Sequence, residues 1–346
     1  MSNLELPEKW QLSFTPFQAA SILNTSVIKR IHQHKKKLLH LGLLGAVFAA
    51  VIIWLWFGFT RPDEKKQTIA ETNSTKKVTR IITRVADTRT DIPYCGGGNK
   101  LQKFDLYLPK QNKNKAFPVV IFIHGGGWIR GDKSNGLVDY YGSKLIERGI
   151  AVASINYRLA PASIYPAQNQ DVACAIKEIA SKAKGFHIDP NRIGLQGDSA
   201  GGLLAAMYTL TRSSELPPIK AVVEFYGTAD LVQQLRAKPG TSFANMYLGG
   251  KDETLARAAS PMYQPIGGTP PFLLFHGNKD PTVNVAQSKR FYERLHADNP
   301  KTQYVEVKGA KHYFTNRNTP NIASIRDKML AFYTDNLVTN PKSKKP

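Results

Sequence analysis

The sequence predicts an α/β domain with a mostly parallel sheet and helices on both of its faces. From Val78 onward, short apolar runs of strand length alternate with longer stretches of helical composition, which is typical of parallel sheets with helical crossovers. Two glycine-rich motifs, at 124–127 and 197–201, each follow directly on an apolar run. Ligand sites in open α/β sheets gather beyond the carboxyl ends of the strands, and Asp280 and His312 each follow an expected strand there.

The elements follow one another as this fold class requires. Pro118–Ile123 is apolar throughout, which indicates a strand buried on both faces, whereas Lys103–Leu108 is amphipathic. The expected strands are Val78–Val85, Lys103–Leu108, Pro118–Ile123, Ile150–Ile155, Ile193–Gln196, Ala221–Tyr226, Pro271–Phe275 and Thr302–Val307. The expected helices are Asp139–Arg148, Asp171–Ala183, Leu203–Leu210, Val285–Ala297 and Ile322–Asn336. The glycine- and proline-rich segment Asp230–Pro270 interrupts this alternation, and it is expected to form either a small cap over the sheet or a long solvated loop.

The second glycine-rich motif presents Ser199 between an apolar strand and a helix rich in Leu, Ala and Met. Its G-x-S-x-G pattern holds a serine on a sharp strand-to-helix turn with the hydroxyl exposed. Gly197 and Gly201 are required because a Cβ at either position would collide with neighbouring backbone. The pentapeptide alone would occur by chance in about one chain in ten of this length, so the flanking strand and helix carry the prediction.

The first glycine-rich motif, His124 to Gly127, follows a buried strand and precedes Trp128. Glycines let the main chain approach a substrate closely, so that backbone N–H groups can stabilise a carbonyl oxygen as it becomes negative. We expect Gly125 and Gly126 to donate to this oxyanion, with the N–H of Ala200 as a third donor. A flexible turn after the strand is the alternative interpretation.

A serine nucleophile needs a base to accept its proton and an acid to orient that base. Asp280 follows the expected strand Pro271–Phe275, and His312 follows the next strand along the chain, which is the order Ser, Asp, His typical of this elbow. Asp230 is the rival acid, although a role as a helix cap fits it better. The remaining histidines considered are less suited: His276 is expected in the core, His296 on a helix, and His187 before the serine.

Several motifs together resemble one family. HGGGW, NYRLAP, an aspartate (Asp171) opening a helix, DPNRIGLQGDSAGG, HGNKDPTV and KGAKH are similar to the α/β-hydrolase carboxylesterases, above all the hormone-sensitive-lipase-like and bacterial feruloyl- and xylan-esterase-like groups. The resemblance implies the α/β-hydrolase fold and a serine esterase. Kynurenine-formamidase-like enzymes share the HGG-x-W loop, so an amidase or formamidase stays open.

The leading hypothesis is a serine carboxylesterase that hydrolyses small carboxylic esters. Ser199 attacks the carbonyl and forms an acyl-enzyme, His312 is general base and then general acid, and Asp280 fixes the imidazole tautomer. No metal or organic cofactor is expected, because CxxC, HExxH and carboxylate clusters are missing from the sequence. A catalytically inactive binding protein on a hydrolase scaffold is the alternative from another class.

The segment Leu38–Phe59 carries no Lys, Arg, Asp or Glu and is long enough to cross a bilayer core of about 30 Å. No small-residue cleavage site follows it, so we expect an uncleaved signal anchor that contacts membrane lipids. Residues 1–37 are expected to form a cytoplasmic tail, 60–77 a linker, 78–338 the catalytic domain with the possible cap at 230–270, and 339–346 a basic tail. A dense basic cluster before the span favours a catalytic domain outside the cytoplasm, on the periplasmic or lumenal side.

The chain of 346 residues has a formal net charge of +21. Its Lys and Arg residues are scattered without a nucleic-acid-binding signature, so a cationic surface near anionic lipids is favoured over nucleic-acid binding. The two cysteines, Cys95 and Cys174, could pair in an oxidising compartment. The expected helix around Cys174 favours two unpaired structural cysteines instead. The oligomeric state stays open.

Overall fold

The computed structural model describes residues 85–110, 116–135, 137–237, 242–314, 319 and 321–338. Within these ranges, no helix has the length and apolar character that a membrane span needs. The expected span Leu38–Phe59, its flanking segments 1–37 and 60–77 and the tail 339–346 lie outside the described residues.

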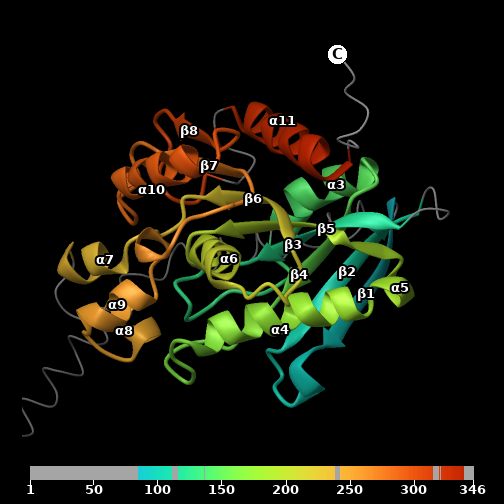
Figure 1. Cartoon of the computed structure of the whole chain (residues 1–346), viewed down its shortest axis with the longest axis horizontal. Helices are drawn as coiled ribbons and strands as arrows, with labels where there is room; N and C mark the ends of the chain where they lie inside the picture. Colours follow the sequence, from blue (N-terminus) through green and yellow to red (C-terminus); the bar gives the residue numbers. More distant parts are fainter. Residues whose placement is uncertain are drawn as a thin grey trace, which may run out of the picture. The chain divides into compact units, whose positions relative to one another are not determined.

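The described part of the chain folds around one eight-stranded sheet with the order β1-β2-β4-β3-β5-β6-β7-β8 (Figure 1). Strand β2 pairs antiparallel with both β1 and β4, and all other pairs are parallel. The strands are β1 (Ala86–Pro93), β2 (Lys103–Pro109), β3 (Phe117–Ile123), β4 (Ala151–Ile155), β5 (Ile188–Asp198), β6 (Ile219–Phe225), β7 (Phe272–Gly277) and β8 (Gln303–Val307). Apart from the first, each overlaps a strand expected from the sequence.

Helices cover both faces of this sheet, as the sequence predicts (Figure 1). Helices α4, α6 and α10 bury apolar side chains in one cluster, and α3 and α11 do so in a second cluster on the other face. The helices are α3 (Ser143–Glu147), α4 (Ala167–Ser181), α5 (Ala183–Phe186), α6 (Ala200–Thr211), α7 (Leu231–Ala237), α8 (Phe243–Leu248), α9 (Glu253–Ala258), α10 (Val285–Asp298) and α11 (Ile322–Tyr333). Short helical turns add η1 (Cys95–Gly97), η2 (Val138–Gly142), η3 (Pro261–Tyr263) and η4 (Thr334–Val338).

The first strand differs from the prediction. Strand β1 begins at Ala86, after the expected Val78–Val85, of which residues 78–84 lie outside the described part. All but two of the β1 residues are exposed, because the strand lies at the edge of the sheet. An exposed edge strand has no need for the apolar pattern that a sequence reading detects.

The segment between β6 and β7 is helical rather than a long loop. Its three short helices α7, α8 and α9 lie next to one another (Figure 1). From α8, the ring of Tyr247 stacks on Trp128 at a centroid distance of 4.4 Å. Helix α8 therefore packs on the loop that follows β3.

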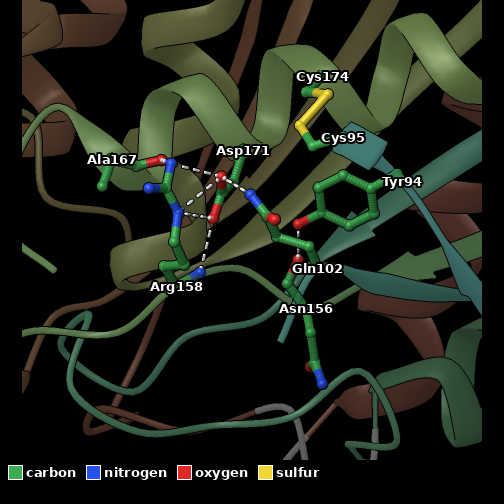
Figure 2. The surroundings of a disulfide bond; sticks show 8 residues. All are labelled: Tyr94, Cys95, Gln102, Asn156, Arg158, Ala167, Asp171 and Cys174. Carbon is green, nitrogen blue, oxygen red and sulfur yellow. Dashed lines mark hydrogen bonds and ion pairs between the residues drawn. A yellow bond between two sulfur atoms is a disulfide. The ribbon is translucent and has the colours of Figure 1, made fainter. Parts of the chain in front are cut away.

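The expectation of unpaired cysteines is wrong. Cys95 and Cys174 form a disulfide with their Cα atoms 5.8 Å apart, and it joins the turn η1 to helix α4 (Figure 2). The helical position of Cys174 is as expected, but the β1–β2 connection folds back onto α4 and brings Cys95 to it. One turn before Cys174, the buried carboxylate of Asp171 accepts hydrogen bonds from Arg158 and Gln102 (Figure 2). The disulfide links helix α4 to the turn η1, and the polar cluster links it to Gln102, just before β2, and to Arg158, in the loop after β4.

Candidate active site

Ser199 lies on the sharp turn between β5 and α6. Its backbone has φ +50° and ψ −115°, a conformation that L-residues rarely adopt. The flanking glycines make this turn possible: a Cβ on Gly197 would overlap the carbonyl of Gly201, and one on Gly201 would overlap that of Ile123. The strained turn places Ser199 at the carboxyl end of β5.

Loops from two other strands bring a histidine and a carboxylate to this serine. His312 follows β8, and its Nε2 lies 3.0 Å from Ser199 Oγ. Its Nδ1 lies 2.6 Å from Oδ2 of Asp280, which follows β7. The structure thus brings together the three residues that the sequence selects as nucleophile, base and acid.

Four donors surround the Asp280 carboxylate. Oδ1 accepts the backbone N–H groups of Thr282 and Val283 at 2.8 and 3.0 Å. Oδ2 faces His312 and, at 3.2 Å, the Nε2 of His276. Burial by itself would raise the pKa of Asp280, but the hydrogen bonds from His276 and His312 hold it below the usual range.

The anionic state of Asp280 fixes the tautomer of His312. A carboxylate only accepts hydrogen bonds, so His312 Nδ1 carries the proton. In the neutral ring Nε2 is then an unprotonated acceptor that faces the hydroxyl of Ser199. This is the protonation state in which the imidazole can remove the serine proton.

The structure contradicts one expectation about the oxyanion loop. The N–H of Gly125 donates to Asp198 Oδ1 at 2.9 Å, so it is engaged and does not point at a substrate. In the described residues, the N–H groups of Gly126 and Gly127 donate to no other group. Ala200 begins α6, where N–H groups have no acceptor within the helix. The donors left for an oxyanion are therefore Gly126, Gly127 and Ala200.

Two buried ionisable groups hold this loop in place. Burial raises the pKa of Asp198 to about 7, against the opposing effect of the hydrogen bond from Gly125. Burial lowers the pKa of His124 to about 4, so its ring is neutral at pH 7. Its Nδ1 lies 2.7 Å from the Gly125 carbonyl, and the ring stacks on Tyr157 at 4.2 Å.

The rival acid has a structural role. Asp230 accepts the backbone N–H of Gln233 at 3.0 Å at the start of α7 and the hydroxyl of Tyr263 at 3.1 Å. It therefore caps a helix, as the sequence suggests. Among the described residues, no group of three or more His, Cys, Asp or Glu side chains could hold a metal ion.

The sequence does not predict the roles of three residues near the site. Gly127 belongs to the predicted motif, but it becomes a candidate donor only because the N–H of Gly125 is hydrogen-bonded to Asp198. Asp198 stands beside the serine in sequence, and its acceptor role follows only from the approach of β3 to β5. His276 is buried in the core as expected, but its contact with Asp280 was missed although the two are four residues apart.

The sheet order, the helices on both faces and the serine at the β5–α6 turn define an α/β-hydrolase fold. Comparison with known proteins agrees. A sequence model of the BD-FAE family matches residues 104–295, more than half of the chain, and the chain belongs to this family of α/β-hydrolase carboxylesterases.

Individual relatives have low sequence identity to this chain. The chain is 32% identical over 239 residues to esterase LipC of Mycobacterium tuberculosis, covering 63% of this chain and 58% of LipC. It is 30% identical over 243 residues to the isoprenylcysteine alpha-carbonyl methylesterase ICME of Arabidopsis thaliana, covering 62% of this chain and 55% of ICME. The chain thus spans little more than half the length of these relatives. The structure of EstE1, a thermophilic carboxylesterase from a metagenomic library, matches with a TM-score of 0.61 at 26% identity, covering 79% of this chain and 98% of EstE1.

Proposed function

We propose that this chain is a membrane-anchored serine carboxylesterase that hydrolyses small carboxylic esters through an acyl-enzyme intermediate. The observation that carries the proposal is the continuous hydrogen-bond chain from Ser199 Oγ through His312 to Asp280, with distances of 3.0 and 2.6 Å. Membership of the BD-FAE family and the esterase names of the relatives support the same reaction class.

The reaction follows from the protonation states of these groups. Ser199 Oγ attacks the ester carbonyl while His312 Nε2 takes the serine proton, and the imidazolium is stabilised by anionic Asp280. The carbonyl oxygen becomes negative and accepts hydrogen bonds from the free N–H groups of the oxyanion loop and Ala200. His312 then passes its proton to the leaving alkoxide, the C–O bond breaks and an acyl-serine remains. Water, deprotonated by His312, attacks the acyl-serine and releases the carboxylic acid and the serine hydroxyl.

The direct test replaces the nucleophile. Ser199→Ala should lower ester turnover by at least about a thousandfold and abolish labelling by a fluorophosphonate, with thermal unfolding unchanged. A folded variant that keeps its activity would show that another residue is the nucleophile. A panel of matched esters and amides, assayed with the wild-type protein, separates an esterase from an amidase or formamidase on the same residues.

We infer that the acyl group is short. The ring of Phe243 packs so closely on Gly127 that a Cβ there would overlap it, and Tyr247 stacks on the next residue, Trp128. Helix α8 thus lies on the oxyanion loop, where it restricts the space for an acyl chain, and each further methylene gains about 0.8 kcal/mol only when it is buried. Among nitrophenyl esters, kcat/KM should be highest between acetate and hexanoate. A maximum at dodecanoate or palmitate would contradict this inference.

For localisation, we propose that Leu38–Phe59 anchors the protein and that the catalytic domain lies on the oxidising, extracytoplasmic side of the membrane. The Cys95–Cys174 disulfide supports this orientation independently of the basic cluster before the span, because disulfides persist in oxidising compartments. An alkaline phosphatase fused to the C-terminus should be active in a bacterial host, since that reporter folds only on the oxidising side. An inactive phosphatase together with a fluorescent cytoplasmic GFP fusion would reverse the orientation.

A further inference from the structure

The candidate acid Asp280 is held by two histidines rather than one. His312 contacts Oδ2 from one side, and His276 reaches the same oxygen from strand β7. The His276 side chain is 0% exposed, so it touches neither solvent nor a substrate at Ser199. Its ring instead links Asp280 to helix α10, where Ser288 Oγ lies 2.7 Å from His276 Nδ1.

The surroundings of His276 determine which of its nitrogens carries the proton. Nε2 faces two acceptors, the carbonyl of Val283 at 3.0 Å and Oδ2 of Asp280 at 3.2 Å, so Nε2 bears the hydrogen. Nδ1 of the neutral ring then accepts the hydroxyl hydrogen of Ser288. All polar atoms of the ring are satisfied in this tautomer, and the Ser288 hydroxyl fixes it.

We propose that His276 is a positioning residue of the esterase reaction, which holds the Asp280 carboxylate in the orientation that His312 requires. The inference rests on the proposed roles of Ser199, His312 and Asp280. The backbone N–H groups of Thr282 and Val283 fix Oδ1, and the Nε2–H of His276, shared between the Val283 carbonyl and Oδ2, restricts rotation of the carboxylate. The carboxylate is then preorganised for the imidazolium that forms during the reaction.

Two kinetic consequences follow from the absence of substrate contact. Loss of the His276 N–H should lower kcat but leave KM unchanged, because ground-state binding of the ester does not involve this residue. Without the second donor, Oδ2 carries more negative charge and favours protonation of His312 in the free enzyme, although the misoriented carboxylate stabilises the transition state less. The acid limb of the kcat/KM profile, which reports the base of the free enzyme, should therefore move to higher pH.

A pair of amide substitutions isolates the hydrogen bond. In His276→Gln the amide nitrogen takes the place of Nε2 and can still donate to Asp280, whereas in His276→Asn the amide reaches only the position of Nδ1, next to Ser288. We expect His276→Asn to lower kcat about tenfold or more, within the range that general acid–base catalysis contributes, with KM within about twofold. His276→Gln should recover most of this loss and return the acid limb toward its wild-type position.

A second variant covers the case in which a core substitution prevents folding. Ser288→Ala removes a single oxygen atom and the hydrogen bond that fixes the ring, and it should lower kcat about threefold with KM unchanged. Ser288→Thr, which keeps the hydroxyl, is its matched control. Equal kcat values and equal acid limbs for folded His276→Asn and His276→Gln would overturn the inference. If neither His276 variant folds, wild-type kinetics for Ser288→Ala would overturn the inference.

The failure of this inference differs from a failure of the proposed function. If Ser199→Ala keeps its esterase activity, the nucleophile is wrong and the role of His276 falls with it. If Ser199→Ala is inactive while His276→Asn has wild-type kcat and pH dependence, the reaction mechanism stands and His276 is only part of the core.

Discussion

Removal of the Cys95–Cys174 disulfide should destabilise the folded domain by about 4.5 kcal/mol. The bond joins residues 79 apart in sequence. For a closed loop of that length, cross-linking removes about 15 cal/mol/K of entropy from the unfolded chain, which corresponds to about 4.5 kcal/mol at 25 °C. The hydrogen bonds of Asp171 to Arg158 and Gln102 remain when the disulfide is lost, so the native position of α4 is retained. The expected decrease in Tm is about 10 °C.

Urea unfolding of the wild type, the two single Cys→Ser variants and the double variant measures this effect. Each single variant breaks the same cross-link, so all three should lose about the same free energy of unfolding, and their effects should not add. The matched control is wild-type protein unfolded with a reductant, which has the same side chains without the cross-link. If the double variant and the reduced wild type both stay within about 1 kcal/mol of the oxidised protein, the loop-closure argument is refuted.

Three further predictions concern buried carboxyl groups. Glu224 on β6 is buried without a hydrogen-bond partner in the described structure, and burial raises its pKa from 4.5 to about 8. Between these two pH values the folded state keeps the carboxyl protonated whereas the unfolded state loses the proton. The free energy of unfolding therefore falls as pH rises from about 4.5 to about 8. Glu224→Gln should therefore gain about 3 kcal/mol over the wild type between pH 5 and pH 8 in urea titrations, and a pH-independent difference would exclude this origin. Asp280→Asn should lower kcat by orders of magnitude, whereas Asp230→Asn should lower mainly the stability of α7; the reverse result in ester assays would move the acid to Asp230. Asp198→Asn keeps an acceptor for the Gly125 N–H and should retain most activity, while Asp198→Ala should lower kcat about tenfold by releasing the oxyanion loop; equal kcat values for the two variants would argue against that role.

The parts of the molecule that the sequence predicts are those in which local pattern and tertiary position coincide. Apolar runs identify β3 and the buried parts of β5 and β7, because strands buried on both faces are mostly apolar. Ser199 could be selected because it directly follows β5, and Asp280 and His312 because they lie in the loops after β7 and β8. The carboxyl ends of parallel strands meet at one edge, so proximity in space follows from order in the chain.

The features that the sequence does not predict depend on contacts between distant segments. No local pattern reveals that the η1 turn reaches α4, so the disulfide was missed. The engagement of Gly125 depends on how near Asp198 lies across the β3–β5 pair. The proposed role of His276 depends on the loop 280–283, which folds back so that Asp280 and Val283 contact His276 on strand β7. Each of these contacts is fixed by packing, which composition and periodicity do not describe.

The pairing of β3 with β5 sets Ile123 opposite Gly197. The first glycine-rich motif begins at the residue after Ile123 and the second at Gly197 itself, and the hydrogen bond from Gly125 to Asp198 joins the two motifs. The loop after β3 and the Ser199 turn are thus direct continuations of one strand pair, and their relative position is set when that pair forms in register. A slip of one residue would turn the side chains of a strand to the opposite faces of the sheet and separate the serine from its oxyanion donors. Under the proposed mechanism, fluorophosphonate labelling of Ser199 would report strand register, and it would separate correctly folded molecules from compact but mispaired ones in a refolding mixture.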